Sequence, residues 1–430
     1  MRSVGTTRPN TTDKEISFKA NSINFLKILL NSFLYFFQSK NKVKYLILNH
    51  PRKKKIGNSF VDIYTDPIID QLNSSYLVLE GLFQLKHLKP SYQKKILYAD
   101  LFDFWPRLIS LFWTPKFTTK ELFSWMELKK DIFEIFGVHI DIKKRVEQEY
   151  TRCIISVWGL KKLLKKLKPD IIIEVVGYNR LNKHVNIAAK EMSIPTVELQ
   201  HGYISKKHIA YNFPEGLEMV KTFPNYIALW GGVYKESISV PINKDRLLVS
   251  GFKFFENFLI KPHLNEHTGS KILFISQGTI GKELGKLAKD LSETIQNENF
   301  EIVYKLHPGE VQDAKKRYAE LYKVPNIQVD DKLSSNLYKT IATASVVIGV
   351  YSTALLEAAS LGKNVIVVKL PGWDGLKELI ENPDLPISSA EVDSKSLAIT
   401  LRLLIKDNKI QPKNNRLIEA YDSTFIEKVI

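Results

Sequence analysis

Residues 301–310 read Glu301-Ile302-Val303-Tyr304-Lys305-Leu306-His307-Pro308-Gly309-Glu310. The short apolar run over Phe300–Lys305 is typical of a buried strand, and Pro308 with Gly309 marks the turn that ends it. In parallel α/β sheets, ligands bind just beyond the carboxyl ends of the strands. The stretch therefore predicts one strand of such a sheet, with Lys305 and His307 at its ligand-binding edge.

The same alternation of strands and helices continues on both sides of this stretch. Further strands are predicted at Lys271–Ser276, Ile327–Val329, Ser345–Val350 and Asn364–Leu370, and helices at Gly281–Gln296, Val311–Tyr322, Leu333–Ala342 and Ala354–Leu361. Strands that alternate with helices predict a parallel sheet. We therefore expect residues 271–410 to form one α/β domain.

The first half of the chain repeats this organisation less regularly. Strands are predicted at Val43–Leu48, Asp170–Val176, Pro195–Leu199, Tyr226–Trp230 and Leu247–Ser250, around an aromatic-rich stretch over 75–165 that reads as helical. The expected divisions are a flexible segment 1–20, a domain 21–260 with that helical insertion, a polar linker 261–270 containing Pro and Gly, the domain 271–410, and a C-terminal helix 411–430. The fold class is thus α/β, with two Rossmann-like domains whose parallel sheets face a central cleft.

Composition agrees with two globular domains. The chain has 430 residues, of which 44% are hydrophobic and 25% charged, and this length exceeds what one ordinary core supports. The single Cys153 excludes a disulfide framework and any cysteine-based zinc site.

Positive charge is concentrated at the N-terminus. The net charge is +16, and residues 1–60 hold twelve Lys and Arg against Asp13 and Glu15, a net +10. Such asymmetry suggests a polyanionic partner, although a merely solvated basic face has the same composition. No helix-turn-helix, zinc-finger or RNA-binding aromatic pattern accompanies the charge, so nucleic acid is not the expected partner.

The apolar stretch Phe25–Phe37 is too short to span a bilayer and contains Lys27 and Asn31. Its apolar residues recur at helical spacing, and three lysines follow within seven residues. Two interpretations stay open: a helix on an anionic membrane surface, or a helix packed on the domain core. Residues 1–20 lack the pattern of a secretory signal, so we expect a cytoplasmic location, with peripheral contact at the inner face of the membrane as one option.

Polar clusters follow several strands of the second half. The first is Ser276-Gln277-Gly278-Thr279, where the following helix offers unpaired N–H groups to an anion. The second contains Lys305, His307 and Pro308, and the third is Tyr351-Ser352-Thr353 at a helix start. Glu357 lies one turn into that helix, where a carboxylate could accept hydrogen bonds from a ribose. These residues predict a site for a phosphorylated nucleotide ligand.

A comparable cluster, Gln200-His201-Gly202, follows a strand of the first half. The imidazole of His201 is suited to accept a proton from a hydroxyl group. Glu174 is a rival base, because a carboxyl among Ile and Val has a raised pKa. His50 and Arg52 follow another strand end and are candidates, with Gln200 and Gly202, for binding an acceptor.

Two absences narrow the chemistry. The sequence has no Asp-x-Asp pair at a strand end and no cluster of His, Asp and Glu with metal-ligand spacing. It also lacks the Gly-rich phosphate loop of nucleotide triphosphatases. We therefore expect an enzyme that needs neither a metal nor another cofactor.

Taken together, Ile194–Gly202, Lys305-Leu306-His307-Pro308 and Tyr351-Ser352-Thr353 with Glu357 resemble bacterial surface-polysaccharide transferases of the GT-B fold. The nearest groups are the CDP-glycerol glycerophosphotransferases, the bacterial polysialyltransferases and the capsule Kdo transferases. The resemblance covers roughly Asp170 to Leu370.

The resemblance implies roles for these residues. His307, Ser352 and Thr353 would hold the donor phosphate, Glu357 the ribose, and His201 would be the base. The adjacent acidic pair before Gly that polysialyltransferases use is missing from the sequence.

The function expected from this resemblance is that of an inverting, metal-independent glycosyltransferase. It would move a sugar from a nucleotide-activated donor to a glycan or lipid-linked glycan of the capsule, O-antigen or teichoic type. The alternatives are a CDP-glycerol-type polyol-phosphate transferase, a UDP-GlcNAc 2-epimerase-like enzyme and a non-catalytic glycan-assembly factor.

Overall fold

The computed structural model describes residues 24–33, 35, 41–115, 119–139, 142–217, 220–259, 271–332, 336–407 and 416–430. The expected flexible N-terminus 1–20 and linker 261–270 lie outside these residues. The chain divides into two compact units, one comprising residues 1–199, 218–227 and 426–430, the other residues 200–217 and 228–425.

The first sheet has seven strands in the order β5-β4-β1-β6-β7-β8-β9. Their bounds are β1 Tyr45–Leu48, β4 Tyr76–Glu80, β5 Ile96–Tyr98, β6 Ile171–Val175, β7 Thr196–Leu199, β8 Tyr226–Leu229 and β9 Leu247–Val249. The registers recorded among β1, β4, β5, β6 and β7 are all parallel. Every residue of β1, β6 and β7 is buried, as expected for strands covered on both faces.

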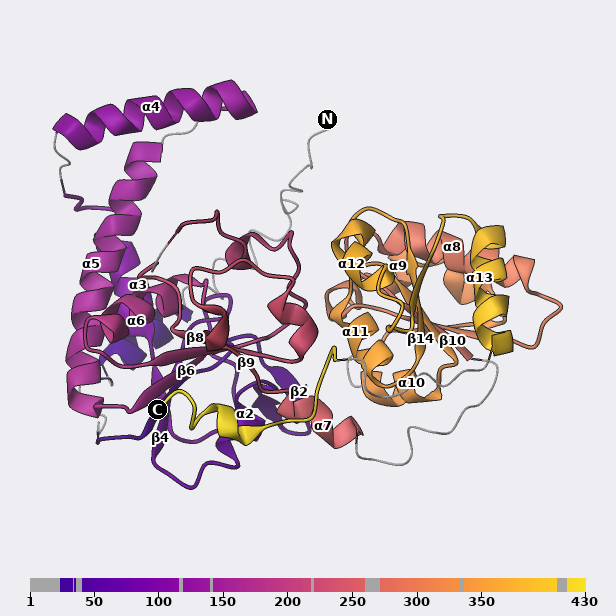
Figure 1. The fold of residues 1–430 in the computed structure, drawn as a ribbon, viewed down its shortest axis with the longest axis horizontal. Coiled ribbons are helices and arrows are strands. Elements are labelled where there is room, and N and C mark those ends of the chain that lie inside the picture. Colours follow the sequence, from indigo (N-terminus) through magenta and orange to yellow (C-terminus); the bar gives the residue numbers. More distant parts are fainter. Residues whose placement is uncertain are drawn as a thin grey trace. The chain divides into compact units, whose positions relative to one another are not determined.

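The helices up to residue 259 are α2 Asp66–Ile69, α3 Asp100–Ile109, α4 Thr119–Phe136, α5 Ile142–Leu167, α6 Arg180–Lys190 and α7 Lys253–Leu259. Helices α3, α5 and α6 lie side by side (Figure 1). The core between α5, α6 and the sheet includes Leu160, Leu164 and Val185 packed with Leu46 and Ile172, all at most 1% exposed. Each such side chain contributes about 2 kcal/mol by leaving water.

Residues 75–165 are largely helical, as expected, but the stretch begins with two strands that were not predicted. Strands β4 and β5 lie there and extend the sheet beyond β1, and the helices begin only at Asp100. The runs Tyr76–Glu80 and Ile96–Tyr98 are short and apolar, and runs of this length do not distinguish a buried strand from a helical turn. A small antiparallel hairpin, β2 Lys54–Ile56 with β3 Ser59–Val61, was also not expected.

The second sheet confirms the predicted parallel arrangement and adds an edge strand. Its order is β12-β11-β10-β13-β14-β15, and every pairing is parallel. The strands are β10 Lys271–Ile275, β11 Glu301–Lys305, β12 Ile327–Asp330, β13 Val346–Gly349, β14 Asn364–Val368 and β15 Ile387–Ala390. The helices are α8 Gly281–Thr294, α9 Ala314–Arg317, α10 Leu337–Thr343, α11 Thr353–Ser360, α12 Lys377–Ile380 and α13 Ser394–Asp407. Strands β10 and β14 lie in the middle of this domain, with α8 and α13 on one side and α10 and α11 on the other (Figure 1).

Both sheets share one feature of their strand order. The first strand in sequence, β1 or β10, has its next two strands on one side and all later ones on the other. The connections leave such a strand in opposite directions, which opens a crevice at the carboxyl ends of the two central strands. The crevices therefore lie beyond β1 and β6 in the first sheet, and beyond β10 and β13 in the second.

The expected C-terminal helix over 411–430 is wrong for the described part, residues 416–430. These residues contain only the single 3₁₀ turn Ser423–Phe425. The backbone of the tail pairs elsewhere: Glu419 N donates to Trp230 O at 2.8 Å, and Asp422 N to Ser250 O at 3.0 Å. Leu417 and Phe425 are fully buried. Because these N–H groups donate hydrogen bonds to residues at the ends of β8 and β9, they are not available for the hydrogen bonds of a helix.

Candidate functional site

Two loops meet at the crevice of the second sheet. Gln277 follows β10 and Tyr351 follows β13, and Tyr351 N donates to Gln277 Oε1 at 3.2 Å. The hydroxyl groups of Thr279 and Tyr351 are also hydrogen-bonded to each other. The structure therefore brings together two of the three predicted donor segments, at the point where the strand order reverses.

Helix α11 begins in the second of these loops. Ser352 is its N-cap, and Ser352 Oγ accepts a hydrogen bond from Ala354 N at 3.3 Å. Because the oxygen is the acceptor in this bond, the hydroxyl hydrogen of Ser352 can still be donated to a ligand. The first N–H groups of a helix lack acceptors within the helix and carry partial positive charge. Ser352 and Thr353 thus form a local environment suited to an anion.

His307 is exposed and held in one orientation by its own turn. Its Nδ1 accepts from Gly309 N at 3.1 Å, and its backbone N donates to Glu310 Oε2 at 3.0 Å. Glu310 is 2% exposed and also accepts from the hydroxyl of Tyr318. In the neutral ring the proton must then be on Nε2, which points a donor outward. Pro308 sits in the first position of this turn.

Lys305 forms an ion pair at the end of its strand. Its Nζ lies 2.8 Å from Asp330 Oδ2, and both side chains are only about one-eighth exposed, at 12% and 13%. The two residues lie directly opposite each other on β11 and β12. The pair thus joins the two strand ends next to His307, and contact of Lys305 with a donor phosphate stays a prediction.

Glu357 is buried on α11. The residue is 7% exposed, and its Oε1 accepts from the hydroxyl of Tyr338 at 3.2 Å. Its contact with a ribose stays a prediction. Gly278 has nothing within 4 Å of an added Cβ, so the loop there is open.

In the first sheet, Gln200 holds the loop that carries His201. Its Oε1 accepts from Trp230 N at 2.7 Å, and its Nε2 donates to Gly202 O at 2.9 Å. With 1% of its surface exposed, Gln200 cannot reach an acceptor, contrary to the expected role. Its amide instead fixes the His201-Gly202 turn. His201 itself is half-buried at the end of β7.

Glu174 is paired with a residue that sequence reasoning missed. Glu174 on β6 and Glu198 on β7 are opposite in register and at most 1% exposed. Between them lies Gly177, where an added Cβ would stand 2.5 Å from Glu198 Oε2 and 2.9 Å from Glu174 Oε1. Asn186 Nδ2 donates to Glu174 Oε1 at 2.8 Å, and Gly177 N donates to Glu198 Oε1 at 2.8 Å. The pair therefore requires glycine at 177.

The burial of this pair argues against Glu174 as a base that contacts substrate. Burial, followed by the charge of Glu198, raises the pKa of Glu174 well above its ordinary value. The next residue, Val176, has a φ of 62°, which a β-branched residue rarely adopts and which is strained. Glu198 lies three residues before His201, and the sequence signal that could have revealed it is this second carboxylate within a buried strand.

We expect Glu174→Gln to alter the pH dependence of stability. The raised pKa means that the contribution of the protonated carboxyl is complete below its ordinary value of 4.5 and is lost as the pH rises through the folded-state pKa. Glutamine is neutral at every pH. The melting temperature of the variant, relative to the native protein, should therefore be higher at pH 8 than at pH 5. Glu283→Gln, on the exposed face of α8, is the control. An equal difference at both pH values would contradict the buried pair.

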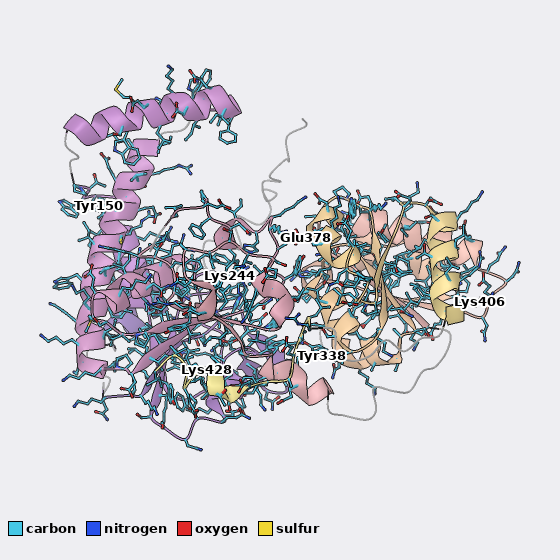
Figure 2. All side chains as sticks on the ribbon, in the orientation of Figure 1. Tyr150, Lys244, Tyr338, Glu378, Lys406 and Lys428 are labelled. Atoms are coloured by element: carbon cyan, nitrogen blue, oxygen red, sulfur yellow. The ribbon has the colours of Figure 1, made fainter. Side chains whose placement is uncertain are left out.

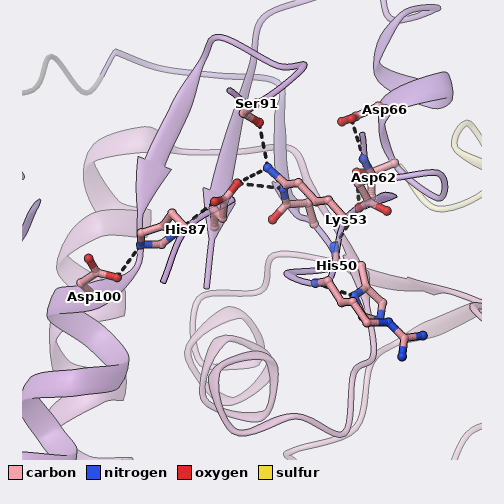
Figure 3. Close-up of polar contacts among 11 residues, drawn as sticks. His50, Lys53, Asp62, Asp66, His87, Ser91 and Asp100 are labelled. Atoms are coloured by element: carbon pink, nitrogen blue, oxygen red, sulfur yellow. Dashed lines mark hydrogen bonds and ion pairs between the residues drawn. The ribbon is translucent and has the colours of Figure 1, made fainter. Parts of the chain in front are cut away.

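His50 and Arg52 follow β1. His50 N donates to Asp62 Oδ2 at 2.7 Å, and His50 Nδ1 accepts from Arg52 N at 3.0 Å. Burial, helped by the charge of Arg52, lowers the pKa of His50 to about 4, so the ring is neutral at pH 7. Arg52 is exposed. Figure 3 shows His50 near a chain of charged side chains that includes Lys53, His87 and Asp100 and that was not predicted from the sequence.

No cluster of three or more His, Cys, Asp or Glu that could hold a metal ion occurs within the described ranges. The polar groups at both crevices are hydroxyls, amides, imidazoles and paired carboxyls.

Comparison with known proteins agrees with this fold. No family model matches the sequence. A curated protein of Psychromonas ingrahamii, UDP-N-acetylglucosamine–N-acetylmuramyl-(pentapeptide) pyrophosphoryl-undecaprenol N-acetylglucosamine transferase, is 21% identical over 299 residues, 65% of this chain and 76% of that protein.

Two solved structures are similar over most of the chain. The UDP-GlcNAc 2-epimerase of Methanocaldococcus jannaschii has a TM-score of 0.55 at 12% identity, and that of Neisseria meningitidis bound to UDP-GlcNAc has 0.53 at 14% identity. Each comparison covers 90% of this chain and 98% of the other. The chain thus has a GT-B-like fold built on two parallel Rossmann-like sheets, as the sequence predicted.

Proposed function

We propose that the protein is an inverting, metal-independent glycosyltransferase that moves a sugar from a nucleotide-activated donor to a bacterial surface polysaccharide. The observation that carries this proposal is the crevice beyond β10 and β13, where the Gln277 and Tyr351 loops join the start of α11. A crevice at such a switch point is where nucleotides bind in related sheets. The similarity to an N-acetylglucosamine transferase supports the same reading.

Residues 271–410 would bind the donor, and residues 21–260 the acceptor. His307 Nε2–H, the hydroxyls of Ser352 and Thr353 and the start of α11 would stabilise the negative charge on the departing nucleotide phosphate. His201 would take the proton of the acceptor hydroxyl as its oxygen bonds to the anomeric carbon. The bond from that carbon to the phosphate oxygen breaks, and the nucleotide leaves with the electron pair.

A second candidate function is epimerisation of a nucleotide sugar without an acceptor. It is favoured by the similarity to UDP-GlcNAc 2-epimerases, which covers 98% of those chains. A CDP-glycerol-type polyol-phosphate transferase is the alternative that changes only the transferred group. A non-catalytic glycan-assembly factor would bind ligands without turning any of them over.

The test has two stages. Thermal unfolding is first measured with CMP-, CDP-, UDP- and GDP-linked donors, because a ligand that binds only the folded state raises the melting temperature. The donor that binds is then radiolabelled and incubated with and without membrane glycan acceptor. Label in polymer only when acceptor is present supports transfer. Conversion of UDP-GlcNAc without acceptor would establish the epimerase instead, and stabilisation by none of the donors would refute both.

We also propose that α5 contacts an anionic membrane surface. Tyr150, Ile154 and Trp158 recur at four-residue spacing on this helix and are 49%, 42% and 62% exposed. Beside them, Lys161, Lys162 and Lys165 line an apolar groove of about 530 Å³. Figure 2 shows the side chain of Tyr150 at the surface of α5. Exposed apolar residues flanked by lysines are typical of a helix that lies in a membrane interface.

The helix over residues 24–33 also exposes apolar side chains. Ile28 and Ser32 are buried, and Asn31 Nδ2 donates to Asp100 Oδ2 at 2.9 Å. Its apolar residues Leu26 and Phe33 are 64% and 60% exposed. This helix therefore packs on the protein through one side and leaves an apolar stripe outside, which favours the membrane-surface interpretation. None of the helices in the described segments is long and apolar enough to cross a bilayer.

Lys162→Glu should weaken binding to phosphatidylglycerol vesicles about 30-fold in co-sedimentation, since each unit of charge near an anionic surface contributes about 1 kcal/mol and this substitution changes two. The matched control is Lys244→Glu, a 77%-exposed lysine in the other compact unit (Figure 2). Equal loss in both variants would indicate nonspecific charge, and no binding of the native protein would refute the surface.

A further inference from the structure

The crevice of the first sheet contains a pocket of about 210 Å³. Its wall is formed by residues at and just after the carboxyl ends of β1 and β4, by one residue of α3 and by the start of α6: Leu48, Asn49, Pro51, Leu79, Gly81, Leu82, Asp103, Asn179, Arg180, Leu181 and Asn182. Strand β1 lies between β4 and β6, so the pocket opens where the strand order reverses. Ligands of such sheets bind at this position.

Asn49 is the polar group of this pocket without a complete set of partners. The residue is 4% exposed, and its Nδ2 donates to Glu80 Oε2 at 3.3 Å. Its Oδ1 is buried and has no hydrogen-bond partner among the described residues. A carboxylate accepts hydrogen bonds, so the amide nitrogen must face Glu80 and the oxygen cannot exchange places with it. A buried oxygen left unpaired destabilises the folded state, which a donor from a ligand would relieve.

A chain of buried charges fixes Asn49 in this orientation (Figure 3). Lys53 and His87 both pair with Glu80, and the other nitrogen of His87 lies 2.9 Å from Asp100 Oδ1. All four side chains are at most 5% exposed. Burial lowers the pKa of His87, but its bonds to Asp100 and Glu80 outweigh burial and raise it. Two cations therefore balance two carboxylates, and the wall behind Asn49 is rigid and close to neutral.

The remaining polar groups of the pocket also have balanced charge. The guanidinium of Arg180 forms two bonds of 2.9 Å with Glu149. Helix α6 is capped by Asn179, whose side chain accepts from Asn182 N at 2.9 Å, and the N–H groups of the first turn have no acceptor within the helix. Leu48, Leu79 and Leu181 provide an apolar face. Asp103 also lines the pocket, and burial raises the pKa of its carboxyl group. The pocket thus offers two side-chain acceptors, Asn49 Oδ1 and the Asp103 carboxyl, together with backbone donors and an apolar wall.

We propose that this pocket binds one neutral sugar ring, with a hydroxyl group of the ring donating to Asn49 Oδ1. Hydroxyls both donate and accept, and the C–H faces of a sugar pack on leucine side chains. A phosphate group would bring negative charge next to Asp103, which lines the same pocket. That the ring is a unit of the acceptor glycan rests on the proposed transferase function; the binding of a sugar here does not.

The experiment measures sugar binding directly, without nucleotide or turnover. Saturation-transfer NMR and titration would be carried out with glucose, galactose, N-acetylglucosamine and glycerol, and with inorganic phosphate as the anionic probe. We expect at least one sugar to bind the native protein, and Asn49→Leu to weaken it about tenfold. Asn49→Asp, which keeps an acceptor of the same shape, should retain more binding. Asn297→Leu, at an exposed asparagine of the other unit, is the matched control.

The outcomes separate this pocket from the proposed function. Equal sugar binding by the native protein and Asn49→Leu, or displacement of the sugar by phosphate, would overturn the pocket assignment. If no sugar binds while nucleotide donors still stabilise the protein, the pocket assignment fails and the transferase proposal stands. If a sugar binds through Asn49 while no donor is bound or consumed, the pocket stands and the transferase proposal fails.

Discussion

His307→Ala is expected to lower the turnover of the nucleotide sugar by about 100-fold or more, the usual effect of removing one donor that stabilises developing negative charge. The structure supplies the reason. Because Nδ1 of His307 accepts from Gly309 N, the neutral ring carries its hydrogen on Nε2, and the residue is exposed after β11, the strand next to β10. The measurement is kcat and KM for the donor identified by thermal unfolding. The loss should fall mainly on kcat, since charge on the phosphate develops only as the bond breaks.

A second variant separates this effect from damage to the turn. His307 also caps the 3₁₀ turn Pro308–Glu310, and the loss of a cap costs about 1 kcal/mol. His307→Asn can still accept from Gly309 N, but its shorter side chain lacks the outward Nε2–H group. It should keep the native melting temperature and lose activity as His307→Ala does. Native activity in His307→Asn would show that only the cap matters and would contradict a role in stabilising phosphate.

The sequence analysis located the strand ends of the second sheet because the information there is local. An apolar run followed by Gly, Pro or Ser indicates a turn at the end of a strand. This local pattern was sufficient to predict that Gln277, His307 and Ser352 lie just beyond strand ends. The partners of those residues were not predictable in the same way. Asp330 neutralises Lys305 only because β11 and β12 pair in one particular register, and the sequence does not specify that register.

The same limit explains what was missed in the first sheet. Glu174 was noticed as a single buried carboxyl, whereas its pairing with Glu198 depends on β6 and β7 being neighbours. The chain Lys53–Glu80–His87–Asp100 joins segments that come together only if β4 and β5 are strands, and both had been interpreted as helical. The prediction of a C-terminal helix was wrong for a related reason. The backbone of the tail forms hydrogen bonds with residues at the ends of β8 and β9, which are far away in the sequence.

The prediction that decides most about mechanism concerns His201. His201→Ala should lower transfer by about 10²- to 10⁴-fold, the range for removal of a general base, while the donor still raises the melting temperature as in the native protein. The two readouts differ because His201 would act on the acceptor hydroxyl and would not hold the nucleotide. His201→Gln, which can form hydrogen bonds but cannot take up a proton at neutral pH, should be as inactive as the alanine variant.

The comparison with Glu174→Gln makes this test decisive between the two candidate bases. Glu174 is fully buried and cannot contact an acceptor, so replacing its carboxyl group by an amide should leave transfer within a few-fold of native. If Glu174→Gln abolished transfer and His201→Gln did not, the proton would have to leave through the buried pair and the assignment of His201 would be wrong. If both variants were active and polymer still formed, the base would lie elsewhere, and the crevice of the first sheet would be the next place to look for it.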